Sequence, residues 1–434
     1  MNISIFGLGY VGAVTAACLA EKGHRIIGVD LHQAKVDAFN QGVSPIVEPE
    51  LDALLKNARD NNQLSATTEA AEAVAASDMS IICVGTPSLP SGTLDLSYVR
   101  HVSAQIASAL AAQGKNHVII FRSTMLPGST RQFVSELFEP LLKAGRVSVY
   151  YCPEFLREGT AVRDFRDPSL VVVGTVDGEA AASGDIAELL GPDPSVLRWE
   201  GAEMIKYSCN YFHALKVGFA NEIGRLCKHL GEDGTRVMDV LCADTKLNIS
   251  RYYMKPGNPF GGSCLPKDVS ALRAFARQQG VTLPLLENTQ ATNDNHQQHL
   301  MRLIEAHQKR KIGFLGLAFK ADTDDLRGSP MVAAAETLIG RGYELRIFDP
   351  QINLSRLIGS NEQQIQARMP HLAQLLQPSA EEVLATSEVI VISQKCATLD
   401  ALRACIRPDQ IITAVNGWRA LQHLPCRYEG ICWG

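Results

Sequence analysis

The sequence predicts an α/β protein with two Rossmann-like doubly wound domains, which are joined by a central helical segment with one long helix. Apolar runs of strand length alternate with helical stretches in the first third of the chain. Such runs vanish between Glu200 and His307, and the alternation starts again at Lys311. Continuous apolar strands are typical of a parallel sheet that helices cover on both faces.

The composition agrees with a globular protein. Of the 434 residues 46% are hydrophobic and 20% are charged, and the net charge is −5, which excludes a disordered chain and a broad basic surface for nucleic acid. No apolar run reaches the ~18–20 residues of a membrane helix, and glycines come too early for a signal peptide. The 11 cysteines include no CxxC pair, so we predict neither disulfides nor a metal site. We expect a cytoplasmic protein that binds neither nucleic acid nor membrane.

The first domain is expected over residues 1–199. Helices are predicted at 11–22 and 98–111, between short apolar strands. These strands are predicted at 3–6, 25–30, 80–84, 118–121, 147–151 and 170–174.

The central domain is expected over 200–307 and the C-terminal domain over 308–434. Helices are predicted in the central domain at 203–229, which contains no proline, and at 267–279. The C-terminal domain has the size of one α/β unit. For it we predict strands at 311–317, 344–349, 388–393 and, last, 410–415, a helix at 331–341 and a helical excursion over 353–380.

The segment Gly-Leu-Gly-Tyr-Val-Gly at 7–12 follows the first strand and opens the first helix. The first glycine of such a segment permits a tight turn, the second lets a pyrophosphate approach, and the third packs the helix against the strand. Asp30 ends the second strand, where a carboxylate binds a ribose 2′-hydroxyl and repels a 2′-phosphate. NAD is therefore predicted rather than NADP, and a purely structural turn is the alternative.

Polar side chains follow two more strands and line one stripe of the long helix. Thr86 and Thr124 would lie at the carboxyl edge of the sheet, where ligands bind, unless they only cap strand ends. On the helix, an ~80° stripe without carboxylates suits an anion or sugar hydroxyls, and a solvated face is the alternative. The stripe consists of Lys206, Asn210, His213 and Asn221.

One cysteine has surroundings that favour reactivity. Cys264 follows Gly261 and Gly262, precedes a predicted helix start and lies near Lys267, which would lower the pKa of its thiol. Asp268 could take part in proton transfer. Core packing is the alternative, and it is what we expect for Cys18, Cys83, Cys209, Cys227 and Cys242.

Two loops add charged groups. Glu154 and Glu158 follow a strand and could activate water, although a solvated loop is the alternative. Lys320 and Arg327 follow the first C-terminal strand and suit phosphate groups. An NAD site with an activated cysteine indicates oxidation through a thiohemiacetal and a thioester. The second domain of nucleotide-binding type indicates that the substrate also carries a phosphate group.

Five segments together identify the chain as a member of the UDP-glucose/GDP-mannose 6-dehydrogenase family, along essentially its whole length. They are the glycine segment at 7–12, Pro-Glu-Phe-Leu-Arg-Glu at 153–158, Glu-Met-Ile-Lys-Tyr at 203–207, Phe-Gly-Gly-Ser-Cys-Leu-Pro-Lys-Asp at 260–268 and Lys-Ala-Asp-Thr-Asp-Asp-Leu-Arg at 320–327. Residues 44–49, 250–257 and 429–433 resemble the branch that oxidises GDP-mannose for alginate. UDP-glucose is the alternative substrate, and a non-catalytic sensor of sugar nucleotides or NAD is an alternative class. A two-electron dehydrogenase of the hydroxyacid type is a third interpretation, which predicts one NADH per substrate.

The resemblance implies oxidation of a sugar C6 alcohol to a carboxylate with two NAD per turnover. It also implies a homodimer or higher homo-oligomer built on the long helix. The implied catalytic residues are Cys264 as the thiol, Lys206 and Asn210 for the oxyanion, and Asp268, Glu154 and Thr124 for proton and water steps. The implied NAD contacts are Gly7, Gly9, Tyr10, Val11, Gly12, Asp30, Lys35, Thr86, Thr124, Lys267 and Arg327. The implied substrate contacts are Glu158, Lys206, Asn210, His213, Asn221, Tyr252, Tyr253, Lys255, Gly261 and Lys320.

Three residues depart from the pattern of that branch. Lys255 stands in place of an arginine, which removes a planar fork for phosphate or base. Asn258 replaces an aromatic residue, and Gly328 replaces the glutamate that usually follows the arginine. These departures bear on base and hexose specificity rather than on the chemistry.

Overall fold

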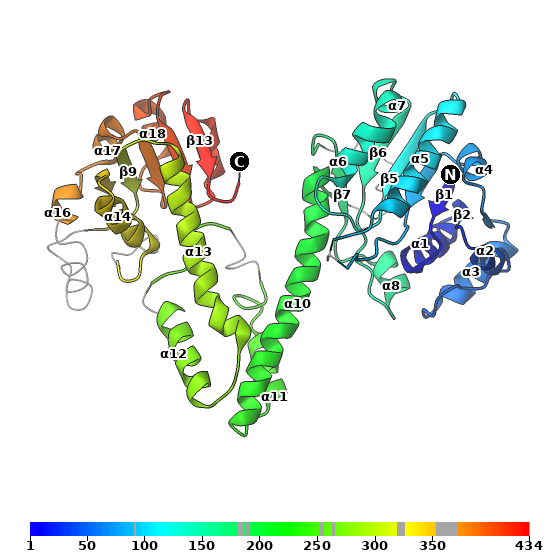
Figure 1. The fold of residues 1–434 in the computed structure, drawn as a ribbon, viewed down its shortest axis with the longest axis horizontal. Coiled ribbons are helices and arrows are strands. Elements are labelled where there is room, and N and C mark those ends of the chain that lie inside the picture. The colour runs from blue at the N-terminus through cyan, green and yellow to red at the C-terminus, as the bar shows by residue number, and fades with distance from the viewer. Residues whose placement is uncertain are drawn as a thin grey trace. The chain divides into compact units, whose positions relative to one another are not determined.

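The computed structural model describes the chain except residues 91–92, 180–185, 187–188, 190, 192, 251–255, 263–264, 319–325, 353–371 and 434 (Figure 1). Side chains at 218, 228 and 267 are also outside the description. Contacts divide the chain into two compact units, Met1–Leu215 and Lys216–Gly434. The expected boundaries of three domains stay a prediction.

The first unit contains one sheet with the strand order β3-β2-β1-β4-β5-β6-β7-β8. The strands are β1 (Asn2–Phe6), β2 (Arg25–Val29), β3 (Leu64–Thr67), β4 (Met79–Ile82), β5 (His117–Phe121), β6 (Val147–Tyr151), β7 (Val172–Thr175) and β8 (Ser195–Arg198). The strands from β3 to β6 are parallel, as the apolar runs predict. The prediction is wrong for β7, which pairs antiparallel with β6 through Tyr151 and Gly174. An antiparallel neighbour needs no helical crossover, and only the short helix α8 lies between these two strands.

Helices cover both faces of this sheet, so the doubly wound fold is confirmed (Figure 1). They are α1 (Tyr10–Glu21), α2 (Gln33–Asn40), α3 (Leu51–Asp60), α4 (Ala70–Ala76), α5 (Ser97–Ala112), α6 (Ser129–Phe133), the π-helical η1 (Val134–Phe138), α7 (Glu139–Lys143) and α8 (Ala161–Arg166). One apolar cluster joins α1, α3 and α8 to the sheet, and a second joins α4, α5 and η1 to its other face. Burial on two faces explains why these strands carry no polar alternation.

The long helix α10 (Trp199–His229) passes from the first unit into the second and has 31 residues. It begins four residues before the predicted start at Glu203. The helices α11 (Gly234–Ala243), α12 (Leu265–Gln278) and α13 (Pro284–Ala306) follow it. No helix in the described ranges is long and apolar enough to cross a membrane.

The sheet of the second unit is parallel throughout and has the order β10-β9-β11-β12-β13. Its strands are β9 (Lys311–Leu315), β10 (Glu344–Phe348), β11 (Val389–Ile392), β12 (Ile411–Ala414) and β13 (Arg427–Gly430). The surrounding helices are α14 (Pro330–Gly340), α16 (Leu372–Leu375), α17 (Ala380–Thr386), α18 (Leu399–Cys405) and the 3-10 helix η3 (Arg419–His423). The prediction that the last strand ends near Val415 is wrong, because β13 adds a polar edge strand. Most of the predicted helical excursion over 353–380 lies outside the described residues.

The two sheets begin with the same turn. The Gly7 N–H donates to Val29 O at 2.8 Å, and the Gly316 N–H donates to Phe348 O at 2.9 Å. Both glycines have a left-handed φ, 95° and 94°, which favours glycine. This shared geometry supports a Rossmann-like fold for both sheets.

Candidate active site

A cleft opens at the carboxyl ends of β1, β2 and β4. Its volume of about 330 Å³ lies within the range of small-molecule sites. Gly7, Gly9, Asp30 and Lys35 line it, together with residues of the loop after β4 and of α5. Four of the predicted dinucleotide residues therefore face a common space.

The glycines of the 7–12 segment meet the spatial demands of a dinucleotide loop. A Cβ on Gly12 would lie 1.8 Å from the Gly7 carbonyl oxygen, so α1 can pack on β1 only through glycine. A Cβ on Gly9 would meet nothing within 4 Å, which leaves open space for a ligand beside the backbone. Tyr10 and Val11 begin α1 and pack partly against the core.

Asp30 is oriented by backbone groups at the rim of the cleft. Its Oδ2 accepts the Leu8 N–H at 2.9 Å, and its Oδ1 accepts the His32 N–H at 3.0 Å. Lys35 Nζ lies 3.3 Å from Oδ2. Burial opposes ionisation, but the His32 and Leu8 N–H groups and the Lys35 charge outweigh it and lower the pKa of Asp30. A fixed carboxylate of this kind suits a ribose hydroxyl.

Two of the predicted hydroxyl residues meet at the carboxyl edge of the sheet. Thr86 follows β4, and its hydroxyl donates to the Thr124 carbonyl oxygen at 2.9 Å. The neighbouring Ser123 hydroxyl donates to Val84 O at 2.6 Å. These bonds join the loops after β4 and β5 into one wall.

Lys206 and Glu154 form a buried ion pair. Lys206 Nζ donates to Glu154 Oε1 and to the Glu154 carbonyl oxygen, both at 2.7 Å. The exposed fractions of the two side chains are 8% and 12%. The Leu156 N–H donates to Glu154 Oε2 at 2.8 Å, and the Phe155 ring lies 5.6 Å from Nζ. The predicted oxyanion donor and the predicted base are thus direct neighbours.

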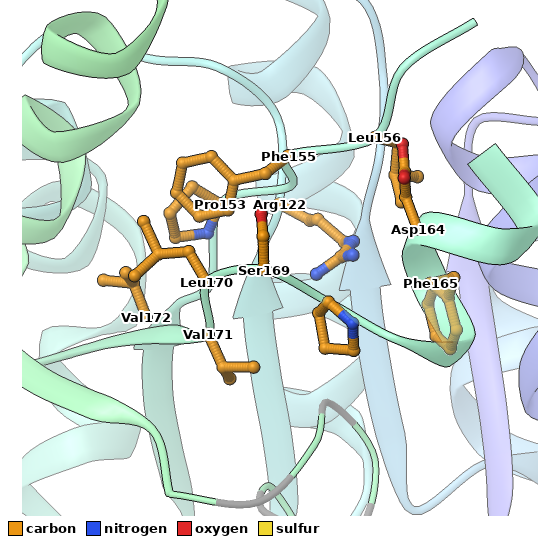
Figure 2. A pocket seen from close by; sticks show the side chains of 11 residues that line it. Arg122, Pro153, Phe155, Leu156, Asp164, Phe165, Ser169, Leu170, Val171 and Val172 are labelled. Carbon is orange, nitrogen blue, oxygen red and sulfur yellow. The ribbon is translucent and has the colours of Figure 1, made fainter. Parts of the chain in front are cut away.

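A small hollow lies beneath the segment that carries Glu154 (Figure 2). Phe155 and Leu156 border it on one side and Ser169 to Val172 on another. Its volume of about 30 Å³ has room for a water-sized group but not for a nucleotide. The buried Arg122 lines this hollow and donates to Cys152 O at 3.4 Å. We therefore interpret Arg122 as a residue that holds the segment in place.

The segment 256–262 leads to Cys264 and is fixed by α13. The Phe260 N–H donates to Asn293 Oδ1 at 2.7 Å, and Asn293 Nδ2 donates to Phe260 O at 2.9 Å. His296 Nε2 donates to Gly257 O at 2.7 Å. Sequence reasoning missed both side chains, because nothing in the polar pattern of α13 distinguishes them from solvated residues.

Gly328, one of the departures, has a steric reason. Its φ is 60°, and a Cβ there would lie 2.7 Å from the Gly262 carbonyl oxygen. A Cβ on Gly261 would in turn lie 2.3 Å from the Gly328 carbonyl oxygen. Gly261, predicted to contact substrate, therefore also serves this close backbone approach.

Several predicted site residues fall outside the description or face solvent. Cys264, Tyr252, Tyr253, Lys255 and Lys320 lie outside the described residues, as does the side chain of Lys267. Asn210, His213 and Asn221 are exposed on α10, unlike Lys206, and Glu158 is also exposed. Asp268 is exposed in the first turn of α12, and Arg327 is half-buried.

The described cysteines include buried thiols that burial makes inert. Burial raises the pKa of Cys18, Cys83 and Cys152 to about 12. The prediction of core packing is wrong for Cys242, because no residue of α11 is buried in the chain. No cluster of His, Cys, Asp and Glu in the described ranges could hold a metal ion.

Comparison with known proteins finds similarity along the whole chain. Models of the UDP-glucose/GDP-mannose dehydrogenase family match residues 1–189 (NAD binding domain), 200–295 (central domain) and 313–416 (UDP binding domain). GDP-mannose 6-dehydrogenase of Pseudomonas aeruginosa is 50% identical over 442 residues, with 100% of both chains covered. UDP-glucose 6-dehydrogenase of Rhizobium meliloti is 36% identical over 363 residues, with 81% of this chain and 82% of the relative covered.

The solved structures agree with these relatives. A crystal structure of a ternary complex of GDP-mannose dehydrogenase from Pseudomonas aeruginosa has a TM-score of 0.93 at 46% identity, with 100% of both chains covered. A UDP-glucose dehydrogenase from Pyrobaculum islandicum has a TM-score of 0.54 at 31% identity, with 100% of this chain and 98% of that chain covered. The similarity thus includes both sheets and the helices between them.

Proposed function

The chain belongs to the UDP-glucose/GDP-mannose dehydrogenase family, and on that premise we propose that it oxidises GDP-mannose to GDP-mannuronate with two NAD⁺ per turnover. It is an NAD-dependent nucleotide-sugar dehydrogenase. One observation carries the choice of sugar. Full-length relatives named GDP-mannose 6-dehydrogenase are 44–50% identical, whereas the relative from Rhizobium meliloti that is named for UDP-glucose is 36% identical. A product of this kind suits polysaccharide biosynthesis in the cytoplasm, including that of alginate.

The residues of the first cleft fit NAD⁺. Open space beside Gly9 would accommodate the pyrophosphate, and the fixed Asp30 carboxylate would accept a ribose hydroxyl and repel a 2′-phosphate. When bound, NAD⁺ accepts a hydride from the sugar at each of two oxidations. Lys35 lines the cleft, and Thr86 bonds Thr124 at the carboxyl edge of the same sheet, so these three residues would help to hold the cofactor.

We assign the covalent steps to Cys264. The C6 alcohol loses a hydride and a proton and becomes an aldehyde, whose carbon the Cys264 thiolate attacks. The resulting oxyanion takes a proton and gives a thiohemiacetal. Loss of a second hydride and proton leaves a thioester, and water then breaks the carbon–sulfur bond to release carboxylate and thiol. Asp268, with Thr124 and Glu154, would move the protons.

The ion pair between Lys206 and Glu154 supports a division of roles. Lys206 Nζ has three N–H donors and makes two bonds to Glu154, so a third donor would serve a substrate oxygen. A preorganised cation stabilises an oxyanion most in a water-poor site, and Asn210 would add an amide donor. Glu154 is held at both carboxylate oxygens, which orients it as an acceptor for a proton of water.

The exposed apolar side chains of α10 and α11 favour a homodimer or higher homo-oligomer. Tyr211, Val217 and Val240 are 71%, 61% and 72% exposed. Such a surface is costly in water and is typical of a buried interface between copies. Sedimentation of the wild type and of Val240→Glu tests this. A monomeric wild type would contradict it.

The function is tested by NADH release with GDP-mannose, UDP-glucose and UDP-N-acetyl sugars. We expect two NADH per GDP-mannose and a much lower kcat/KM for the others. A preference for UDP-glucose would overturn the choice of sugar, and binding without NADH release would indicate a sensor. Cys264→Ser should abolish formation of the acid while NAD binding persists, and wild-type turnover in this variant would refute the covalent mechanism.

A further inference from the structure

A buried carboxylate to which the proposed function gives no role lies between the dinucleotide loop and the segment of Glu158. Glu48 belongs to the loop between α2 and α3, and 6% of its surface is exposed. Its Oε2 accepts the Tyr10 hydroxyl and the Gly159 N–H, the latter at 2.8 Å. Its Oε1 accepts the Ala161 N–H at 2.7 Å. One carboxylate thus collects donors from two separate parts of the chain.

These donors are neutral, and together they stabilise the ionised form. Burial opposes the charge, but hydrogen bonds from Tyr10, Gly159 and Ala161 outweigh it and lower the pKa of Glu48. A carboxylate only accepts hydrogen bonds, so all three donors must point toward it. Their mutual positions therefore depend on the negative charge.

The two ends of this arrangement are both placed for ligand contact. Tyr10 is the first residue of α1 and follows Gly9 at the cleft. Its hydroxyl also lies 3.3 Å from the Arg157 carbonyl oxygen. Residues 157–161 contain Glu158 and end at the start of α8. Any displacement of the Tyr10 hydroxyl would therefore alter the bonds that hold 157–161.

We propose that Glu48 is a positioning residue that couples the dinucleotide loop to residues 157–161, so that a bound cofactor orders the segment that meets the sugar nucleotide. The inference rests on the proposed function for the identity of both ligands. The coupling itself needs only the cofactor and no sugar. Through Tyr10 and Glu48, a bound cofactor would make residues 157–161 more ordered without contacting them.

The loop of Glu48 offers a matched control. Glu50 lies two residues later and accepts from Arg166 Nη1 of α8 at 2.7 Å, but it does not bond Tyr10. Glu50→Gln therefore weakens a link between the same loop and the same helix without touching the dinucleotide loop. Glu48→Gln preserves volume but turns an N–H₂ group toward donors, which breaks the shared geometry.

The test is hydrogen–deuterium exchange of the Gly159 and Ala161 amides with and without NADH, in the absence of any sugar. In the wild type we expect NADH to slow exchange at least about fivefold, the lower end of typical coupling between sites. Glu48→Gln and Tyr10→Phe should reduce the slowing to less than about twofold, whereas Glu50→Gln should preserve it. The Glu48→Gln Tyr10→Phe double variant should be no worse than either single variant.

Three outcomes would overturn the proposal. They are full NADH-dependent protection in Glu48→Gln, no protection in the wild type, and an equal loss in Glu50→Gln. Tyr10→Phe keeps the test valid if Glu48→Gln does not fold. Because no sugar is present, failure of the coupling is distinguishable from failure of the proposed reaction, which the NADH-release assay reports separately.

Discussion

The stability of the first unit should fall in mild acid because of one buried histidine. His117 begins β5 and is 3% exposed. Its Nε2 lies 2.7 Å from the Ser80 hydroxyl, the Ser80 hydroxyl lies 2.8 Å from that of Ser4, and the Ser77 hydroxyl donates to Ser4 Oγ at 3.0 Å. Burial, and after it the charge of Lys115, lowers the pKa of His117 from 6.5 to about 4. The folded unit therefore holds this ring neutral.

The sign and size of the effect follow from proton linkage. Between pH 6.5 and about 4 the unfolded chain binds a proton that the folded unit does not. Stability is therefore complete above the unfolded pKa and declines as the pH falls. For these two pKa values the loss between about pH 8 and about pH 5 is about 2 kcal/mol, and it approaches about 3.4 kcal/mol at lower pH.

The assay is urea unfolding, monitored through hydrogen–deuterium exchange of the buried amides of β4 and β5. This probe reports on the first unit alone, which is needed because a chain of two units need not unfold in one step. His117→Gln is the matched variant, since its amide can still bond the Ser80 hydroxyl but does not titrate. The wild-type free energy of unfolding should fall by about 2 kcal/mol more than that of the variant between the two pH values. An equal fall in both proteins would refute the reasoning.

Three further predictions concern the candidate site. Lys206→Met leaves the Glu154 carboxylate buried without its cation, so thermal unfolding should show a loss of about 3–5 kcal/mol in the stability of the first unit. The kcat should also fall at least about a hundredfold. An unchanged melting temperature would contradict the buried ion pair. Gly12→Ala places a Cβ 1.8 Å from Gly7 O, and NADH fluorescence titration should show affinity reduced at least about tenfold, whereas wild-type affinity would exclude the close packing. Asp30→Ala should raise the Kd for NAD about 10-fold to 100-fold and reduce the preference of the protein for NAD over NADP. An unchanged ratio of the Kd values for NAD and NADP would contradict the contact of Asp30 with the ribose.

Elements that follow from local pattern could be predicted from the sequence. The strand β1, the start of α1 and Asp30 occur within one short stretch, and the glycines between them predict the tight turn that the structure has at Gly7. The long α10 follows from uninterrupted helical sequence. Family resemblance adds catalytic roles for Lys206 and Glu154 but does not predict their buried ion pair, which is found only in the structure.

Elements that depend on distant partners could not be predicted. The contact of Glu48 with Ala161 joins residues 113 positions apart, and Asn293 meets Phe260 across 33 positions. The helix α13 is rich in Asn, Thr and His, which are weak helix formers, so packing rather than propensity stabilises it. The antiparallel direction of β7 leaves no trace in an apolar run, because such a run reads the same in both directions.

The turn at Gly316 is followed by an acid, Asp349, which backbone N–H groups hold as they hold Asp30. Asp349 is 4% exposed, and its oxygens accept the N–H groups of Leu317, Ala318 and Gln351 at 2.8–3.0 Å. A cleft of nucleotide-binding size is found beside Asp30, and the proposed function places both NAD⁺ molecules of a turnover in that one cleft in succession. On the proposed stoichiometry, the spent cofactor must leave and a fresh one arrive midway through each catalytic cycle. The half-oxidised sugar has to wait through that exchange, and a covalent tether to sulfur would prevent its escape.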